Sequence, residues 1–261
     1  MSVAVFSTMI CIWCKSDHTT LSKEHAIPEA LGCPPQLILD DVACKTCNNS
    51  FGKVDHALVK QFEIISVMLG VRRKGKRPPT IDSWSAISSE HCADGPHIYI
   101  NRGPGDIAAN GKKLRPARRS NGIEDAWIKP EDSKMGFSQQ FGNDPLFLPS
   151  LYKIGLNLVA YNFGAETAAS PQYDHVRAFV RSEKGASFLK VAMDAVPTQT
   201  ATNRVSGPIT KNGRAYPMFQ VTLLGVTFLL DMAPDQPCLR DLRGAATMMG
   251  EKLYVFPAPK A

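Results

Sequence analysis

Apolar residues recur at steps of three and four positions between Phe51 and Leu69, and this spacing predicts a helix with one buried face. Asn48 or Asn49 is expected to cap the start of this helix, and Gly70 with the basic run after it is expected to end it. The positions predicted to face the core are Phe51, Val54, Leu58, Phe62, Ile65 and Leu69.

The residues before this helix favour short strands separated by breakers. Residues 5–14 and 18–27 have the composition of strands or of a compact hairpin arm, and residues 37–42 are predicted to form the returning strand. Gly32 and the prolines between these segments exclude regular structure there. The first seventy residues therefore predict a strand, a hairpin and a helix in that order.

The remainder of the chain changes character after the basic, proline-rich segment 71–82, which we interpret as a boundary. Residues 83–145 predict short strands and long loops. Residues 151–164 predict an apolar helix that ends at a glycine, with Leu151, Ile154, Leu158 and Tyr161 on one face. Residues 216–232 predict a hairpin or one long bulged strand, with Gly225 in its middle.

Composition narrows the class of protein. The chain has 261 residues, of which 44% are hydrophobic and 21% charged, as is usual for a globular protein with a core. No apolar run reaches the length of a membrane span, and the N-terminus has no basic segment typical of a signal peptide. The seven cysteines are odd in number and four of them are paired by spacing, which favours metal binding over disulfides and indicates a cytoplasmic protein.

Positive charge is concentrated in one segment. The net charge is +6, yet residues 72–119 alone carry eleven basic side chains against four acidic ones. Clustered Lys and Arg suggest a partner that bears phosphates, whereas the alternative is a solvated basic loop. The candidate nucleic-acid-binding residues are Arg72, Arg73, Lys74, Lys76, Arg77, Lys112, Lys113, Arg115, Arg118 and Arg119.

Two CxxC pairs, CIWC at 11–14 and CKTC at 44–47, have the spacing of a structural zinc site. Cys11 and Cys14 would bind one side of the ion, and Cys44 and Cys47 the other. A redox-active CxxC is a weaker alternative, because it needs one pair at a helix N-terminus and not two around a hairpin. Such a zinc site would stabilise a unit whose own core is small.

Glu24 and His25 lie between the two CxxC pairs, and Asn48 follows the second. Four thiolates saturate a zinc ion, so this acid and imidazole are not its ligands. A neutral imidazole can take a proton from water, and a hard divalent cation prefers oxygen ligands such as a carboxylate and an amide. The three residues therefore combine a general base with two oxygen ligands, a set suited to hydrolysis of a phosphodiester.

These motifs resemble the HNH, or ββα-metal, endonucleases, in the subgroup whose finger is held by a four-cysteine zinc site, as in phage junction-resolving nucleases. The resemblance covers about residues 9–70 and rests on CIWC, EHAIPEALG and CKTCNNSFGKVDHAL. It implies that His25 activates water and that Glu24 and Asn48 bind a catalytic Mg²⁺ or Mn²⁺. Asn49 or Asp41 would orient the hairpin, and Asp55 or His56 could support or replace a ligand.

The sequence departs from the usual family pattern in having Glu24 where Asp is common before the base, and Asn48 where His is common. The predicted fold class is α+β, with a zinc-stabilised ββα finger in residues 1–72. A larger mixed α+β domain, which would position nucleic acid or recognise a partner, is expected in residues 80–261. The resemblance also suggests a setting in phages or bacterial defence.

The preferred functional interpretation is a metal-dependent DNA endonuclease. The first alternative is an inactive, zinc-stabilised protein that only binds nucleic acid, and a weaker one is a zinc-ribbon interaction module whose basic segment binds RNA.

Overall fold

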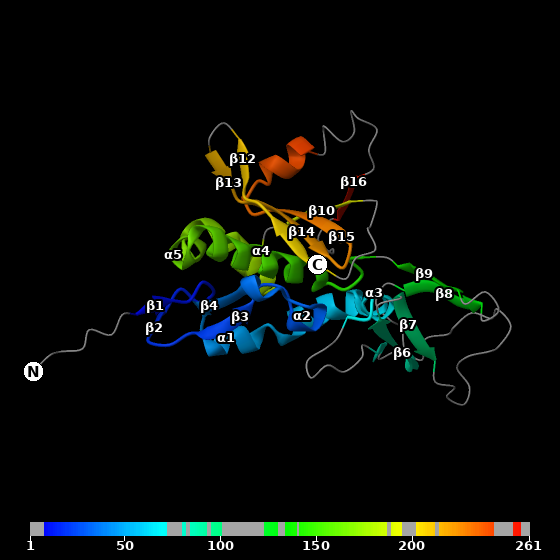
Figure 1. Ribbon diagram of the computed structural model, residues 1–261. Coiled ribbons are helices and arrows are strands. Elements are labelled where there is room, and N and C mark those ends of the chain that lie inside the picture. The colour runs from blue at the N-terminus through cyan, green and yellow to red at the C-terminus, as the bar shows by residue number, and fades with distance from the viewer. Residues whose placement is uncertain are drawn as a thin grey trace, which may run out of the picture.

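The computed structural model describes residues 8–71, 80–81, 84–92, 95–100, 123–129, 134–139, 141–186, 189–194, 202–211, 214–242 and 253–256. They form an α+β protein with an N-terminal ββα finger, which we define as residues 8–71, followed by a larger mixed region (Figure 1). Both parts of the predicted fold class are confirmed. None of the helices in these described stretches combines the length and the hydropathy that crossing a bilayer requires.

The finger contains two small antiparallel sheets and three consecutive helices. Strands β1 (Met9–Ile10) and β2 (Asp17–His18) pair, as do β3 (Ser22–His25) and β4 (Ile38–Ala43). Short 3-10 turns at Glu29–Leu31 and Pro35–Leu37 connect β3 to β4. The helices are α1 (Lys45–Ser50), α2 (Gly52–Gln61) and α3 (Glu63–Met68). The predicted order of strand, hairpin and helix is confirmed.

The predicted helix over residues 49–70 differs from the structure in two ways. Helix α1 begins at Lys45, because the Cys44 side chain caps it by accepting a hydrogen bond from the Cys47 amide. Asn48 therefore lies inside the helix and does not cap it. The helical run is also interrupted at Phe51 and Phe62, and after the second break the fully buried positions shift to Ile64 and Val67.

The larger region is built around α4 (Phe147–Phe163) and a five-stranded antiparallel sheet. The strand order is β11 (Arg204–Ser206), β14 (Met218–Leu223), β15 (Val226–Asp231), β10 (Val191–Asp194) and β16 (Leu253–Phe256). The short helices α5 (Ala165–Ala169) and α6 (Asp174–Val180) follow α4. Strands β12 (Ile209–Lys211) and β13 (Arg214–Tyr216) form a separate pair.

Two further small sheets come from the segment predicted as short strands. One contains β5 (Thr80–Ile81), β6 (Trp84–Cys92) and β7 (Gly95–Ile100), and the other β8 (Ile123–Lys129) and β9 (Lys134–Gln139). The predicted hairpin around Gly225 is also confirmed, since β14 and β15 are joined by a turn in which Leu224 and Gly225 have positive φ angles of 48° and 89°. Glycine suits such a turn because it lacks the Cβ that disfavours positive φ.

Helix α4 lies between the finger and the large sheet (Figure 1). It contacts α2 and β4 on one side and β15 on the other, and every residue from Phe147 to Ala160 is buried. The predicted glycine end is confirmed at Gly164, but Tyr161 is 50% exposed and does not belong to the core face. One hydrophobic cluster runs from the finger through α4 into the sheet. The domain boundary near residues 72–80 stays a prediction.

Candidate active site and metal centre

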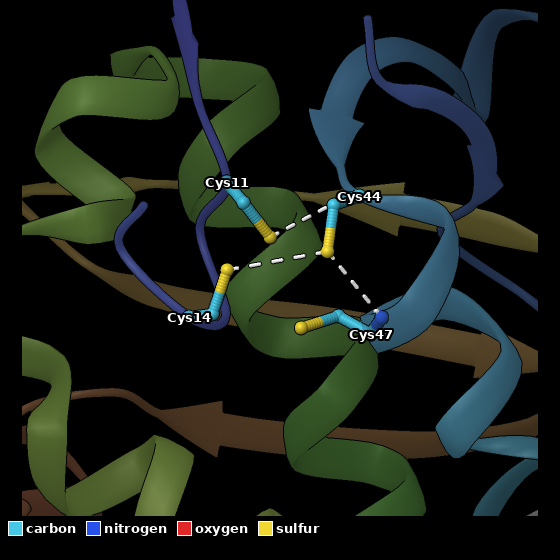
Figure 2. A group of neighbouring side chains, drawn as sticks. All are labelled: Cys11, Cys14, Cys44 and Cys47. Atoms are coloured by element: carbon cyan, nitrogen blue, oxygen red, sulfur yellow. Dashed lines mark hydrogen bonds between the residues drawn. The ribbon is translucent and has the colours of Figure 1, made fainter. Parts of the chain in front are cut away.

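Four cysteines from two separate segments converge at the base of the finger (Figure 2). Cys11 and Cys14 come from the turn after β1, while Cys44 caps α1 and Cys47 lies in its first turn. Their sulfur atoms all lie within 4.8 Å of one another, and the Cys14 and Cys44 sulfurs are 4.0 Å apart. Tetrahedral zinc with Zn–S bonds of about 2.3 Å places its sulfurs about 3.8 Å apart. The cluster is therefore compatible with structural zinc.

Donors around the cluster favour a thiolate at Cys14, whereas burial raises the pKa of Cys11 and Cys47. The Cys44 amide donates to the Cys11 sulfur at 3.2 Å, and His18 Nε2 lies 3.6 Å from the Cys14 sulfur. Burial raises the pKa of Cys14, but hydrogen bonds, led by the one with His18, outweigh it and lower this pKa to about 6. Burial and the neighbouring cysteines raise the pKa of Cys47. A divalent cation would relieve this repulsion between crowded sulfurs.

The acid and the imidazole of the predicted site differ in their surroundings. Glu24 and His25 are consecutive, and His25 is the last residue of β3. Glu24 is 1% exposed and points into the protein, whereas His25 is only partly buried. Within the described residues, the side chain of His25 makes no hydrogen bond or ion pair, so its imidazole is available for other partners.

Two residues of α4 hold the Glu24 carboxylate. Lys153 Nζ pairs with Glu24 Oε1, and Asn157 Nδ2 donates to the same oxygen at 3.2 Å. Glu24 Oε2 is buried and has no hydrogen-bond partner within the described part of the chain. One oxygen of the predicted ligand is therefore engaged by two donors, and the other lacks any protein donor there.

Asn48 shows the same division between its two terminal atoms. Its Nδ2 donates to the Lys23 carbonyl oxygen at 2.9 Å and to Ser22 Oγ at 3.2 Å. A carbonyl oxygen can only accept a hydrogen bond, so the Asn48 atom that faces it must be the NH₂ nitrogen, and this fixes the orientation of the Asn48 amide. Within the described residues no donor reaches Asn48 Oδ1. These two contacts attach Asn48 to the residues of β3 that directly precede Glu24.

Lys153, like Asn157, is a residue of this site that the sequence analysis missed. Its ammonium lies 3.1 Å from Asp55 Oδ1 and 5.8 Å from the centre of the Phe51 ring, besides its pair with Glu24. Burial lowers the pKa of Lys153, but attraction to Glu24 and Asp55 outweighs it and raises this pKa. A signal was present, because Lys153 and Asn157 are polar residues four positions apart in an otherwise apolar helix.

The remaining predicted site residues lie at the surface or outside the described residues. Asp41 is exposed and has a φ angle of 59°, in an irregularity of the β3–β4 pairing. Asn49 and His56 are exposed on α1 and α2, and Asp55 is 32% exposed beside Lys153. Every residue predicted to bind nucleic acid falls outside the described residues, and these assignments stay predictions.

The available oxygen atoms suit a hard divalent cation. Glu24 Oε2 is a buried carboxylate oxygen without a donor in the described residues. Asn48 Oδ1 is an amide oxygen that takes no part in the hydrogen bonds made by Asn48 Nδ2. Magnesium and manganese are bound in proteins through one or two such oxygens, with water and phosphate supplying the rest. Within the described residues, the two carboxylates of Glu24 and Asp55 face one ammonium, that of Lys153, which leaves an excess of negative charge there.

Comparison with known proteins gives a family match within the finger. Residues 11–63 match the family model HNH_5, described as HNH endonuclease. No curated protein and no solved structure matches the chain significantly. The match begins at the first zinc-type cysteine and includes Glu24, His25 and Asn48, so it covers the cysteine cluster and the candidate catalytic residues together.

Proposed function

We propose that this chain, whose residues 11–63 carry an HNH endonuclease domain, is a metal-dependent endonuclease that hydrolyses phosphodiester bonds in DNA. One observation supports this most strongly. Glu24 Oε2 and Asn48 Oδ1 are left without protein donors in the described residues, and the side chain of His25, which directly follows Glu24 on β3, makes no hydrogen bond or ion pair there. A purely structural site would be expected to pair its buried polar atoms.

In the proposed reaction His25 is the general base. Its partly exposed imidazole would accept a proton from the attacking water, which raises the nucleophilicity of the oxygen. Glu24 and Asn48 would hold a Mg²⁺ or Mn²⁺ ion, which, when bound, stabilises charge on the scissile phosphate and on the leaving oxygen. The hydrogen bonds that Asn48 makes to β3 keep its amide in one orientation for this purpose.

The four cysteines would bind a structural zinc ion that fixes the hairpin. Cys44 and Cys47 lie immediately before Asn48 on α1, and Cys11 and Cys14 precede β3, so one ion ties together the segments that carry the base and both oxygen ligands. Lys and Arg residues between Arg72 and Arg119 would bind the phosphates of the nucleic acid, with an affinity that falls as salt rises.

A nicking assay on supercoiled plasmid tests the proposal. With Mg²⁺ or Mn²⁺ we expect the wild-type chain to nick DNA, EDTA to stop the reaction, and His25→Ala to slow it about 100- to 10,000-fold, which is the usual contribution of a general base. His175→Ala, a half-buried histidine on α6, is the matched control and should retain activity.

The same experiment separates the proposal from its alternative. DNA binding without nicking, equal in the wild type and in His25→Ala, would show a zinc-stabilised protein that only binds nucleic acid. Parallel reactions with single-stranded DNA, branched DNA and RNA identify the preferred substrate.

A further inference from the structure

We propose that Lys153 and Asn157 are positioning residues that restrict Glu24 to one ligand oxygen and so favour small, octahedral divalent cations over Ca²⁺. This inference rests on the proposed function, because that function assigns Glu24 to the catalytic cation. It adds two residues from α4, which lies outside the matched segment 11–63.

The first observation is that both donors converge on the same atom. Lys153 Nζ and Asn157 Nδ2 each bind Glu24 Oε1, and neither donates a hydrogen bond to Oε2. The three side chains are almost fully enclosed, with 3% of Lys153, 1% of Glu24 and none of Asn157 exposed. At this degree of burial the carboxylate has little freedom to rotate, so the two oxygens keep distinct roles.

The second observation is that Glu24 Oε2 remains buried without a donor in the described residues, although polar side chains lie close by. A pair that served only to join α4 to the finger would be expected to share its donors between both oxygens, because an unpaired buried oxygen costs free energy. With both donors on Oε1, Glu24 Oε2 remains able to bind a partner that is not a protein donor, such as a cation.

The third observation concerns charge. Asp55 approaches the Lys153 ammonium to 3.1 Å from the side of α2, and so offsets the repulsion that this ammonium would exert on a second cation. Glu24, Asp55 and Lys153 together carry one net negative charge. A divalent cation at Oε2 is therefore electrostatically favoured even with an ammonium beside the same carboxylate.

Coordination chemistry connects this geometry to selectivity. Calcium takes six to eight oxygens in flexible geometry and often uses both oxygens of one carboxylate. Magnesium and ions of similar size prefer octahedral sites with single-oxygen carboxylates and bound water. With Oε1 held by two donors, bidentate binding by Glu24 would require displacing at least one of those hydrogen bonds, which penalises Ca²⁺ selectively.

The test measures cation binding directly on the zinc-loaded, full-length chain in the absence of DNA. Isothermal titration calorimetry gives the dissociation constants of Mn²⁺ and Ca²⁺ for the wild type, Lys153→Met and Asn157→Leu. The informative quantity is the ratio of the two constants, because a change in site charge affects both divalent ions alike. We expect the preference for Mn²⁺ over Ca²⁺ to fall about tenfold in each variant, in the range usual for residues that orient a ligand.

Lys23→Met is the matched control. It removes the same positive charge from the residue next to Glu24, but its side chain is 75% exposed and pairs only weakly with Asp40 at 3.6 Å. The two dissociation constants should shift together in this variant, with no change in their ratio. If Lys153→Met does not fold by circular dichroism, Asn157→Leu, which changes no charge, decides the question.

The outcomes distinguish the inference from the function on which it rests. Wild-type binding of Mn²⁺ with an unchanged ratio in the folded variants overturns the role of Lys153 and Asn157 and leaves the proposed nuclease intact. If the wild type binds neither ion and does not nick DNA, the proposed function fails, and the inference fails with it.

Discussion

At the scale of single residues, burial separates the two neighbours Glu24 and His25. The carboxylate is enclosed and held by α4, whereas the imidazole remains partly accessible and makes no ion pair within the described residues. A general base needs access to water, and a ligand needs a fixed position. The environments of the two side chains therefore match the roles proposed for them.

The buried pair of Glu24 and Lys153 should matter strongly for stability. Lys153→Met leaves the Glu24 charge without its ammonium, and we expect the free energy of unfolding to fall by about 3–5 kcal/mol, the usual cost of removing one partner of a buried pair. The double variant Glu24→Met, Lys153→Met leaves no unpaired charge on either residue and should recover much of this loss. Urea unfolding measures the free energy of unfolding of the single and the double variants. A double variant that lost as much stability as the two single variants added together would contradict the predicted recovery.

At the scale of elements, α6 fastens the first cysteine pair to the rest of the protein. Arg177 donates to the carbonyl oxygens of Ile12 and Ala168 at 3.1 and 2.6 Å. Arg181 donates to the Trp13 carbonyl oxygen at 2.9 Å and lies 3.9 Å from the Cys47 sulfur. These contacts hold the turn between Cys11 and Cys14 in place from outside the finger. The position of the cysteine cluster thus depends on an element far along the chain.

Asp174, in the first turn of α6, gives this attachment a pH dependence. Hydrogen bonds from Arg177 and Lys15 lower the pKa of Asp174 below its ordinary value of 3.8. A carboxyl with a lowered pKa in the folded state stabilises the protein above the ordinary pKa, and this contribution is lost as the pH falls through the folded value. The difference in unfolding free energy between wild type and Asp174→Asn should therefore be largest above pH 3.8 and shrink below it.

Urea titrations of both proteins at a series of acidic pH values provide the measurement. Because the cysteine cluster is present in both, its own sensitivity to acid cancels in the comparison. A difference that stayed constant as the pH fell below that ordinary value would show that Asp174 does not act through its charge.

At the scale of the whole molecule, the finger and the large sheet share one hydrophobic core through α4. Polar contacts add to this connection, since Asn203 donates to the Leu31 and Gly32 carbonyl oxygens at 2.6 and 2.9 Å and accepts from the Leu224 amide at 3.0 Å. The loop between β3 and β4 is thereby attached to the hairpin of β14 and β15. A change that destabilises the finger should consequently also destabilise the large sheet.

Removal of the proposed zinc ion tests this connection. Treatment with a strong chelator should lower the temperature at which the whole protein unfolds, including the large sheet, because the core that joins them is continuous. Differential scanning calorimetry is expected to show one transition that shifts downward, and re-addition of zinc should restore it. A sheet that melted separately at an unchanged temperature would contradict a shared core.

The sequence by itself determined the features that depend on short separations along the chain. The spacing of the cysteines, the apolar steps from Phe51 to Phe62 and the turn at Gly225 are local patterns. The structure has a cysteine cluster compatible with zinc, the helix α2 and the β14–β15 hairpin at these places. The sequence analysis predicted a helix start at Asn48 or Asn49, but α1 begins at Lys45 because Cys44 acts as its cap. Cys44 had been assigned only to the zinc site.

Only the tertiary structure decided which side chains meet across long separations. Glu24 and Lys153 are 129 residues apart, and nothing in the local pattern around either one specifies the other. Their meeting follows from the packing of α4 between the finger and the sheet, which depends on the fit of many apolar side chains at once. The residues proposed to perform chemistry were candidates from the sequence, whereas Lys153 and Asn157 were visible there only as polar positions whose partner the sequence does not specify.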